Sequence, residues 1–332
     1  MAPTLLSPRS TVLLATDGSA AAAAAARVAF ELATERGAIV HVVSVLDVRR
    51  VPLQPLSDLS IATRLPSDDA PPRANHADVV RDGIAKAVGR TVAWPVHIVL
   101  GTPAESIVRE AHRLDASLIV MGLRRHGQLD RGIHDETTLS VIRRAACPVL
   151  AVTATTTELP TRALVGMDFG RASSIAARCV ADLVRDGGNV VLTYVPPLAT
   201  EQIDEGERRV RELGIDAAFA QCERELGEQG ASTQRAIVNH KLPQSIAKLL
   251  LESAENAKAD LIAAGSVRPG RIPWLLGSVT TALVRSGRRS LLIVPPMEPI
   301  VPSSRAREAS RGIWTAGRSA DPTTPPYALR TG

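Results

Sequence analysis

Two acidic residues occupy matching places in the two halves of this 332-residue chain. Asp17 follows an apolar run at residues 11–16, and Asp168 ends a similar run at 162–168. If each run is a parallel strand, both carboxylates lie at the carboxyl edge of a sheet, where open α/β sheets bind ligands. A carboxylate at that edge can accept hydrogen bonds from the base or ribose of a nucleotide. Capping of the following helix is the alternative interpretation, since aspartate is a favoured N-cap.

A second candidate for ligand binding follows the fourth apolar run of the second half. Gly265 leaves that run, a segment rich in turn residues follows, and Gly277 and Ser278 begin the next predicted helix. Free backbone N–H groups and the positive end of a helix dipole make such a start suitable for an anion. The Ser278 hydroxyl would add one donor to a phosphate oxygen. Alternatively, Ser278 caps its own helix and Gly277 forms the turn.

Other polar and aromatic residues indicate less. Tyr194 ends the second apolar run of the second half, where it either flanks an adenine or packs in the core. His126 and His134 lie near Asp135 and Glu136, but their spacing fits no metal-ligand pattern, so we predict exposed loop histidines and no metal site. The chain has neither a G-x-x-x-x-G-K-[ST] loop nor a G-x-S-x-G motif. We therefore expect no catalytic residues and a protein that is not an enzyme.

The chain contains an internal repeat. Four segments of the first half recur in the same order in the second: Thr11–Ser19 with Arg162–Gly170, Pro103–Ile107 with Pro243–Ile246, Ser117–Gly122 with Asp260–Gly265, and Val149–Val152 with Leu291–Val294. Such self-similarity indicates a duplicated structural unit.

Each half alternates short apolar runs with amphipathic or alanine-rich segments, which predicts βαβ units and a parallel sheet covered on both faces. The last strand of each half is apolar and would leave an exposed edge, so we expect the halves to pack there as an internal pseudo-dimer. The predicted strands are 11–16, 39–46, 95–100, 117–121 and 148–153, then 162–168, 189–195, 234–238, 260–264 and 290–295; the predicted first-half helices are 19–36, 74–89, 103–114 and 136–145.

Composition limits the function classes. Only 2% of the residues are aromatic, so the cores must consist of alanine, valine, leucine and isoleucine. The segment from residue 302 onward holds five arginines and two acids, which leaves the rest of the chain almost neutral. Without a basic face or stacking aromatics we expect no nucleic-acid partner.

Cysteine usage and hydropathy indicate the compartment. Three widely spaced cysteines, Cys147, Cys179 and Cys222, favour a reducing cytoplasm over a disulfide framework. No apolar run approaches the roughly 20 residues that a membrane-spanning helix needs. The amino terminus has no charged region ahead of its apolar stretch, unlike a signal peptide. We expect a cytoplasmic protein with no membrane contact.

The chain resembles the universal stress protein family over residues 10–153 and 161–296. The resemblance rests on the segments LLATDGS, GTPAESIV, ASLIVMG and ACPVLAV in the first half and LVGMDFG, ADLIAAG and LLGSVTTALVRSGRRSLLIVPP in the second. It implies two tandem Rossmann-like, doubly wound α/β domains, each with a five-stranded parallel sheet, and dimer-like packing through the last strand. In ATP-binding members it implies a G-x2-G-x9-G-S/T loop around the phosphates, together with the aspartate that ends the first strand.

The resemblance implies a set of nucleotide-binding positions in each half. In the second half these are Gly166, Asp168, Tyr194, Gly265, Arg268, Gly277, Ser278 and Val279; the weaker first-half set is Asp17, Val45 and Gly122.

Both halves depart from the family's loop. In the first half Arg125 replaces the second glycine, and Asp135 and Glu136 replace the Gly-Ser pair. Two carboxylates at a helix start satisfy its dipole and repel phosphate, so we expect no triphosphate there. In the second half Arg268 replaces the second glycine. Arg268 and Arg271 would either neutralise phosphates, or Arg268 would fill the pocket.

The sequence thus predicts domain 1 at residues 1–153, a linker at 154–160, domain 2 at 161–296 and a disordered tail at 297–332. Residues 47–73 contain five prolines and are predicted to form a surface loop. We expect a stress-response or regulatory binding protein that holds ATP or AMP in its second domain only. The alternative is a nucleotide-free protein-interaction module. We also expect a protein partner, and homodimerisation stays open.

Overall fold

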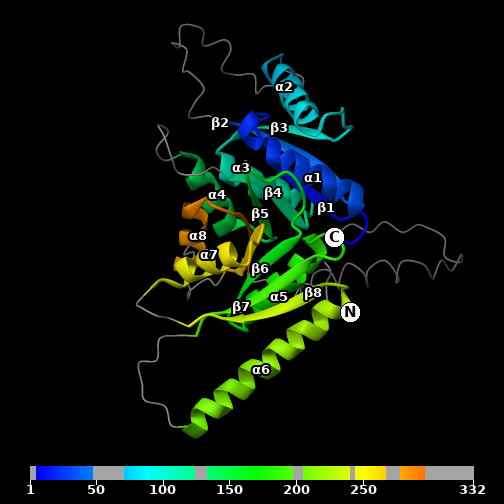
Figure 1. Cartoon of the computed structure of the whole chain (residues 1–332). Coiled ribbons are helices and arrows are strands. Elements are labelled where there is room, and N and C mark those ends of the chain that lie inside the picture. The colour runs from blue at the N-terminus through cyan, green and yellow to red at the C-terminus, as the bar shows by residue number, and fades with distance from the viewer. Residues whose placement is uncertain are drawn as a thin grey trace, which may run out of the picture. The chain divides into compact units, whose positions relative to one another are not determined.

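The computed structural model describes residues 5–47, 71–123, 133–196, 205–239, 244–266 and 277–295. Its ten strands form one continuous sheet in the order β3-β2-β1-β4-β5-β10-β9-β6-β7-β8 (Figure 1). The strands are β1 (Thr11–Ala15), β2 (Ile39–Asp47), β3 (Val96–Gly101), β4 (Leu118–Leu123), β5 (Val149–Thr153), β6 (Arg162–Met167), β7 (Asn189–Tyr194), β8 (Ser232–Ile237), β9 (Leu261–Gly265) and β10 (Ser290–Val294).

The strand pairing confirms the predicted fold. Within each half all neighbouring strands are parallel, and both halves have the same order when strands are counted from the start of each half, 3-2-1-4-5. Helices connect the strands and cover both faces of the central ones, whereas the edge strands β3 and β8 stay partly exposed. These helices are α1 (Ala23–Glu35, after a 3-10 turn at Ala20–Ala22), α2 (Pro71–Val88), α3 (Pro103–Arg113), α4 (Ile133–Arg144), α5 (Arg171–Leu183), α6 (Glu205–Glu228), α7 (Ile246–Asn256) and α8 (Ser278–Ser286).

Helix α2 begins earlier than predicted. The sequence predicts a loop over residues 47–73 and a helix from residue 74, whereas the helix starts at Pro71 and β2 extends to Asp47. Proline is compatible with the first helical turn, because the N–H that it lacks has no partner inside the helix there. The remainder of the predicted loop, residues 48–70, lies outside the described residues, as does the predicted tail.

Each face of the sheet carries one hydrophobic core. In β1, Val12 and Leu14 point to one face, and Leu13 and Ala15 to the other, as the two-residue period of a strand requires. The first core packs beneath α1, α2, α5 and α6, and the second beneath α3, α4, α7 and α8. Apart from Phe219, the largest fully buried side chains of the described residues are leucines and one isoleucine.

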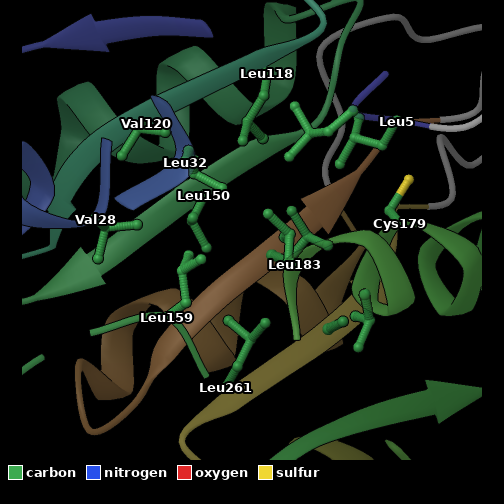
Figure 2. Close-up of a cluster of buried hydrophobic side chains, with 14 of the residues drawn as sticks. Leu5, Val28, Leu32, Leu118, Val120, Leu150, Leu159, Cys179, Leu183 and Leu261 are labelled. Carbon is green, nitrogen blue, oxygen red and sulfur yellow. The ribbon is translucent and has the colours of Figure 1, made fainter. Parts of the chain in front are cut away.

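Strands β5 and β10 join the two halves in an antiparallel pair. Leu292 lies opposite Leu150, and Ile293 lies opposite Val149. This pairing confirms the predicted internal pseudo-dimer. Figure 2 shows how the core continues across the junction: Leu150 lies with residues of α1, of the linker and of the second half, namely Val28, Leu32, Leu159, Leu183 and Leu261.

Ion pairs reinforce the same junction. The half-buried Arg185, just after α5, pairs with Glu31 of α1 at 3.1 Å and with Glu158 of the linker at 2.5 Å. In the opposite sense, Arg36 at the end of α1 pairs with Asp186 at 3.1 Å. Each half therefore supplies a cation to an acid of the other half.

A polar cluster lies on the sheet beneath α3. His41 Nδ1 of β2 is 3.3 Å from His97 Nε2 of β3, and the two rings are stacked and nearly parallel, at 17°. Glu110 of α3 accepts two hydrogen bonds from Arg113, at 2.6 and 2.9 Å, and its Oε1 lies 3.6 Å from His97 Nδ1. Burial, His97 and Arg113 lower the pKa of His41, whereas the Arg113 hydrogen bonds lower the pKa of Glu110.

The β5–β10 junction predicts a large effect of core truncation. Leu150 and Leu292 are 3% and 0% exposed, so replacement of either by alanine leaves a cavity and should lower the free energy of unfolding by about 2–5 kcal/mol. Leu213→Ala is the control, because Leu213 is 63% exposed on α6 and its loss should change stability by about 0.5 kcal/mol or less. Urea denaturation measures all three; equal effects would contradict a stabilising role for the junction.

The histidine cluster predicts a pH dependence. In the unfolded chain the pKa of His41 is about 6.5, and in the folded chain it is lower. Below pH 6.5 the unfolded state therefore binds more protons than the folded state, and the free energy of unfolding falls as the pH falls. His41→Gln should flatten the fall in unfolding free energy between about pH 6.5 and 5. The separate fall below about pH 4.5, where Glu110 becomes protonated, should remain.

The control is His112→Gln on the exposed side of α3, which should leave the pH profile unchanged. Urea titrations at a series of pH values give the comparison. An unaltered profile in the His41 variant would show that this cluster does not control acid stability.

Candidate functional site

The carboxyl edge of the second-half sheet brings together four of the predicted residues. Met167, next to Asp168, pairs with Tyr194 of β7, and Gly166 pairs with Ala264 of β9, next to Gly265. Because neighbouring strands lie about 4.8 Å apart, Gly166, Asp168, Tyr194 and Gly265 gather within a few strand widths.

Asp168 is held as a fixed hydrogen-bond acceptor. Its Oδ1 accepts the Gly170 N–H at 2.8 Å and the Ser173 hydroxyl at 2.5 Å, while Phe169 between them adopts a left-handed backbone with φ of 57°. The N-cap of α5 is Gly170, so Asp168 forms a turn ahead of the helix and is not its cap. The residue itself is exposed, and Oδ2 makes no hydrogen bond with the described part of the chain.

The role of Ser173 is not predicted from the sequence. The sequence feature that could have indicated this hydrogen bond is a serine five residues after the aspartate, in the first turn of the next helix. The corresponding residue of the first half is Ala22, so this interaction exists on one side of the repeat only.

Two helix starts with no cap side chain lie at this edge. Gly170 caps α5 and Gly277 caps α8; neither provides a side-chain hydrogen bond, and neither helix has an acid in its first turn. Both helices follow strands whose carboxyl ends are neighbours, β6 and β9. At α5 the Asp168 carboxylate already accepts the Gly170 N–H, so it is at the start of α8 that free N–H groups and a positive dipole end favour an added anion.

The predicted loop residues divide into two groups. Ser278 is exposed and is the first residue of α8, with Gly277 as the cap, so Ser278 does not cap its own helix; Val279 is half-buried beside it. Arg268 and Arg271 lie in residues 267–276, outside the described part of the chain.

The two strand glycines have packing reasons. A Cβ on Gly265 would lie 2.5 Å from the carbonyl carbon of Ala172, because the end of β9 packs against the start of α5. A Cβ on Gly166 would lie 3.1 Å from Leu250 of α7. These glycines let helices approach the edge closely, whether or not a ligand binds.

Tyr194 belongs to an aromatic cluster that the sequence did not reveal. Its ring lies 5.1 Å from that of Phe169, and Phe169 meets Phe219 of α6 edge-on at 5.0 Å. Arg235 stacks over Phe219 at 5.5 Å. The half-buried Tyr194 ring therefore packs on the core with one part and leaves another part accessible at the edge.

The corresponding edge of the first half is closed by backbone. Asp17 Oδ1 accepts the Ser19 N–H at 2.9 Å, and the next residue, Gly18, has φ of 73°. A Cβ on Gly18 would lie 2.9 Å from the Val80 Cα, and a Cβ on Gly83 would lie 2.2 Å from the Gly18 oxygen. Helix α2 thus packs directly on the turn after Asp17.

The remaining first-half candidates lie on strands and a helix. Val45 is half-buried near the end of β2, and Gly122 pairs with Val152 near the end of β4. Helix α4 begins at Ile133, so Asp135 and Glu136 lie within its first turn. Arg125 and His126 lie outside the described residues.

The thiols are protonated at neutral pH. Burial raises the pKa of both Cys147 and Cys179 to about 12 and also raises that of Cys222.

Within the described ranges, no three histidine, cysteine or acidic residues lie close enough to hold a metal ion. No described helix is both long and apolar enough to cross a membrane.

Comparison with known proteins gives matches in both halves. The family model described as "Universal stress protein family" matches residues 8–153 and again residues 160–295. A universal stress protein of Mycobacterium tuberculosis is 26% identical over 220 residues, which cover 63% of this chain and 72% of that protein.

Solved structures match over most of the chain. A universal stress protein from Archaeoglobus fulgidus covers 88% of this chain and 98% of its own, with a TM-score of 0.59 and 18% identity. A functionally unknown protein from Pseudomonas aeruginosa covers 92% and 98%, with a TM-score of 0.55 and 16% identity. At these identities the likeness concerns the fold.

The contact between β9 and α5 predicts that Gly265 tolerates no side chain. Gly265→Ala should lower the free energy of unfolding by about 1–3 kcal/mol, because backbone atoms of Ala172 and Ser173 occupy the space of the new methyl group. Gly227→Ala is the matched control: it lies in α6 with open space around it, and alanine there should stabilise by about 0.5–1 kcal/mol. Chemical denaturation of both variants tests this; a neutral Gly265→Ala would contradict the close contact.

Proposed function

Since the chain belongs to the universal stress protein family, we propose that it is a regulatory binding protein that holds an adenine nucleotide, ATP or AMP, in its second half. The observation that carries the proposal is the helix start at Gly277, which has no side-chain cap and no acid in its first turn. A helix start of this kind favours phosphate.

Five of the predicted residues have a role in this proposal. The phosphates would accept hydrogen bonds from the first N–H groups of α8, at Ser278 and Val279, and from the Ser278 hydroxyl. Arg268 would neutralise phosphate charge. The second carboxylate oxygen of Asp168 would accept a ribose hydroxyl or an adenine N–H, and Tyr194 would lie against the base. The contacts of Oδ1 with Gly170 and Ser173 support this role, because they fix the direction of Oδ2.

The first half is proposed to be a degenerate partner. Packing of α2 on Gly18 fills the space beside Asp17, and α4 carries two carboxylates in its first turn. A phosphate there would meet like charge and occupied volume.

We propose a cytoplasmic, non-catalytic role. In support, Asp168 is already tied to two donors and is a fixed acceptor, which suits ligand orientation more than proton transfer. The three cysteines form no disulfide, which agrees with a reducing compartment.

A nucleotide-free interaction module is the second candidate, and one observation favours it. Helix α6 exposes Val210 by 71% and Leu213 by 63%, three residues apart and so on neighbouring positions of one helix face. Such side chains are suited to a protein partner.

Titration calorimetry with ATP and with AMP tests the proposal. Ser278→Ala removes one hydrogen bond to a charged phosphate, which is worth about 1.5–3 kcal/mol, so the dissociation constant should rise about tenfold or more. Gly277→Asp places a carboxylate at the helix start and should weaken binding further. Ser286→Ala is the control, since Ser286 lies at the far end of α8 and bonds only Leu283.

The outcomes separate the candidates. Equal affinity of Ser278→Ala, Gly277→Asp and the parent would place the ligand elsewhere. A parent that binds neither nucleotide would reject the proposed site and favour the interaction module.

A further inference from the structure

We propose a second ligand site, for a small oxyanion, at the junction of the two repeats. A pocket of about 290 Å³ lies where β5 ends and β10 begins. Its lining combines linker residues with the residues that precede β9 and β10: Thr153, Thr155, Thr156, Thr157, Glu158, Leu159, Thr161, Asp260, Arg288 and Arg289.

The pocket is separate from the proposed nucleotide site. Asp260, Arg289 and Thr161 come just before β9, β10 and β6, so they lie at the amino edge of the second-half sheet. Asp168 and Gly265 lie at the carboxyl edges of the same strands. The full length of the strands β6 and β9 therefore separates the two sites.

The two acids of the pocket already have partners. Asp260 Oδ2 accepts the N–H and hydroxyl of Thr161, both at 2.9 Å, and the Arg162 N–H at 3.1 Å. Glu158 pairs with Arg185 at 2.5 Å. Neither carboxylate pairs with an arginine of the pocket.

The two arginines, by contrast, are uncompensated. Arg288 is exposed and Arg289 is half-buried, and neither forms a hydrogen bond or ion pair within the described part of the chain. The two arginines are adjacent in sequence and line the same pocket, so an anion bound there would offset both positive charges. Each presents a planar fork of donors that matches a phosphate or carboxylate.

Threonines of the linker also line the pocket. Thr153 Oγ1 lies 3.2 Å from Thr155 Oγ1 and 3.0 Å from Thr156 Oγ1, and Ser290 Oγ lies 2.7 Å from Thr156 Oγ1. Arg27 of α1 holds this part of the linker through the Thr156 carbonyl, at 3.3 Å. The linker is therefore ordered by both halves, and its hydroxyls add donors to a bound oxyanion.

Size and charge define the ligand class. A volume of about 290 Å³ is at the small end of ligand pockets, which span roughly 300–1,000 Å³. The ligand would be a small molecule with phosphate or carboxylate oxygens, such as a phosphate monoester or a dicarboxylate. Because the linker and the residues before β10 both line the pocket, binding would also stabilise the folded chain by mass action.

Calorimetric titration with inorganic phosphate, glycerol 3-phosphate and succinate tests the site and separates phosphate from carboxylate ligands. We expect at least one of the three to bind the parent with a dissociation constant below about 1 mM. The double variant Arg288→Gln with Arg289→Gln should weaken that binding at least tenfold. Arg285→Gln is the matched control, an exposed arginine on the last turn of α8 outside the pocket, and should bind like the parent.

A second variant tests the site independently, in case the double variant does not fold. Thr157→Val removes a hydroxyl of the pocket wall and should weaken the same anion severalfold, with an unchanged circular dichroism spectrum. No binding of any probe by the parent at about 10 mM, or equal binding by the double variant and the parent, would overturn the proposal. An equal loss in Arg285→Gln would do the same, because it would indicate non-specific charge attraction.

The test is independent of the nucleotide site. Ser278→Ala should leave anion binding at the junction unchanged, whereas loss in that variant would assign the anion to the α8 start and overturn the second site.

Discussion

The antiparallel pairing of β5 with β10 is the interaction on which the rest of the structure depends. Each half of the chain ends in a strand of apolar residues, and an unpaired edge of this kind would expose both backbone groups and side chains. Pairing Leu150 with Leu292 removes both edges at once and joins ten strands into one sheet. It also reverses the second half relative to the first, so the carboxyl edges of the two halves face opposite ways and each edge is built by its own half.

The two carboxyl edges show how one fold gives two different environments. In the first half a pair of glycines, Gly18 and Gly83, lets the backbone of α2 contact the turn after Asp17. In the second half Phe169 takes the place of Gly18 and contacts Phe219 of α6. These two aromatic rings keep the backbone of α6 away from the turn after Asp168, whereas the two glycines of the first half allow direct backbone contact. The aspartate is retained in both halves, yet the space next to it depends on the helix that packs there. Membership of the universal stress protein family therefore determines the sheet and leaves the ligand edge to individual side chains.

The tandem arrangement also creates a surface that neither repeat has alone. The linker passes over the junction and is held from both sides, by Glu31 and Arg27 of α1 and by Arg185 after α5. Its threonines meet the arginines before β10, while the nearby acids are satisfied by other groups. A covalent linker thereby places polar donors beside the seam of the two halves.

Much of the fold and part of the candidate site could be predicted from the sequence. The alternation of apolar runs with helical segments determined the order and nature of the elements, and the repeat determined that both halves share one topology. Because parallel strands end at a common edge, the positions of Asp168, Tyr194 and Gly265 also followed from the sequence. The contacts between residues distant in the chain did not: the Phe169–Phe219 contact, the closure of Gly18 by α2 and the pocket beside Arg288 were decided by tertiary structure alone. Periodicity encodes which face of an element is buried, but the partner that buries it depends on how helices pack across the sheet, and local sequence carries no record of that packing.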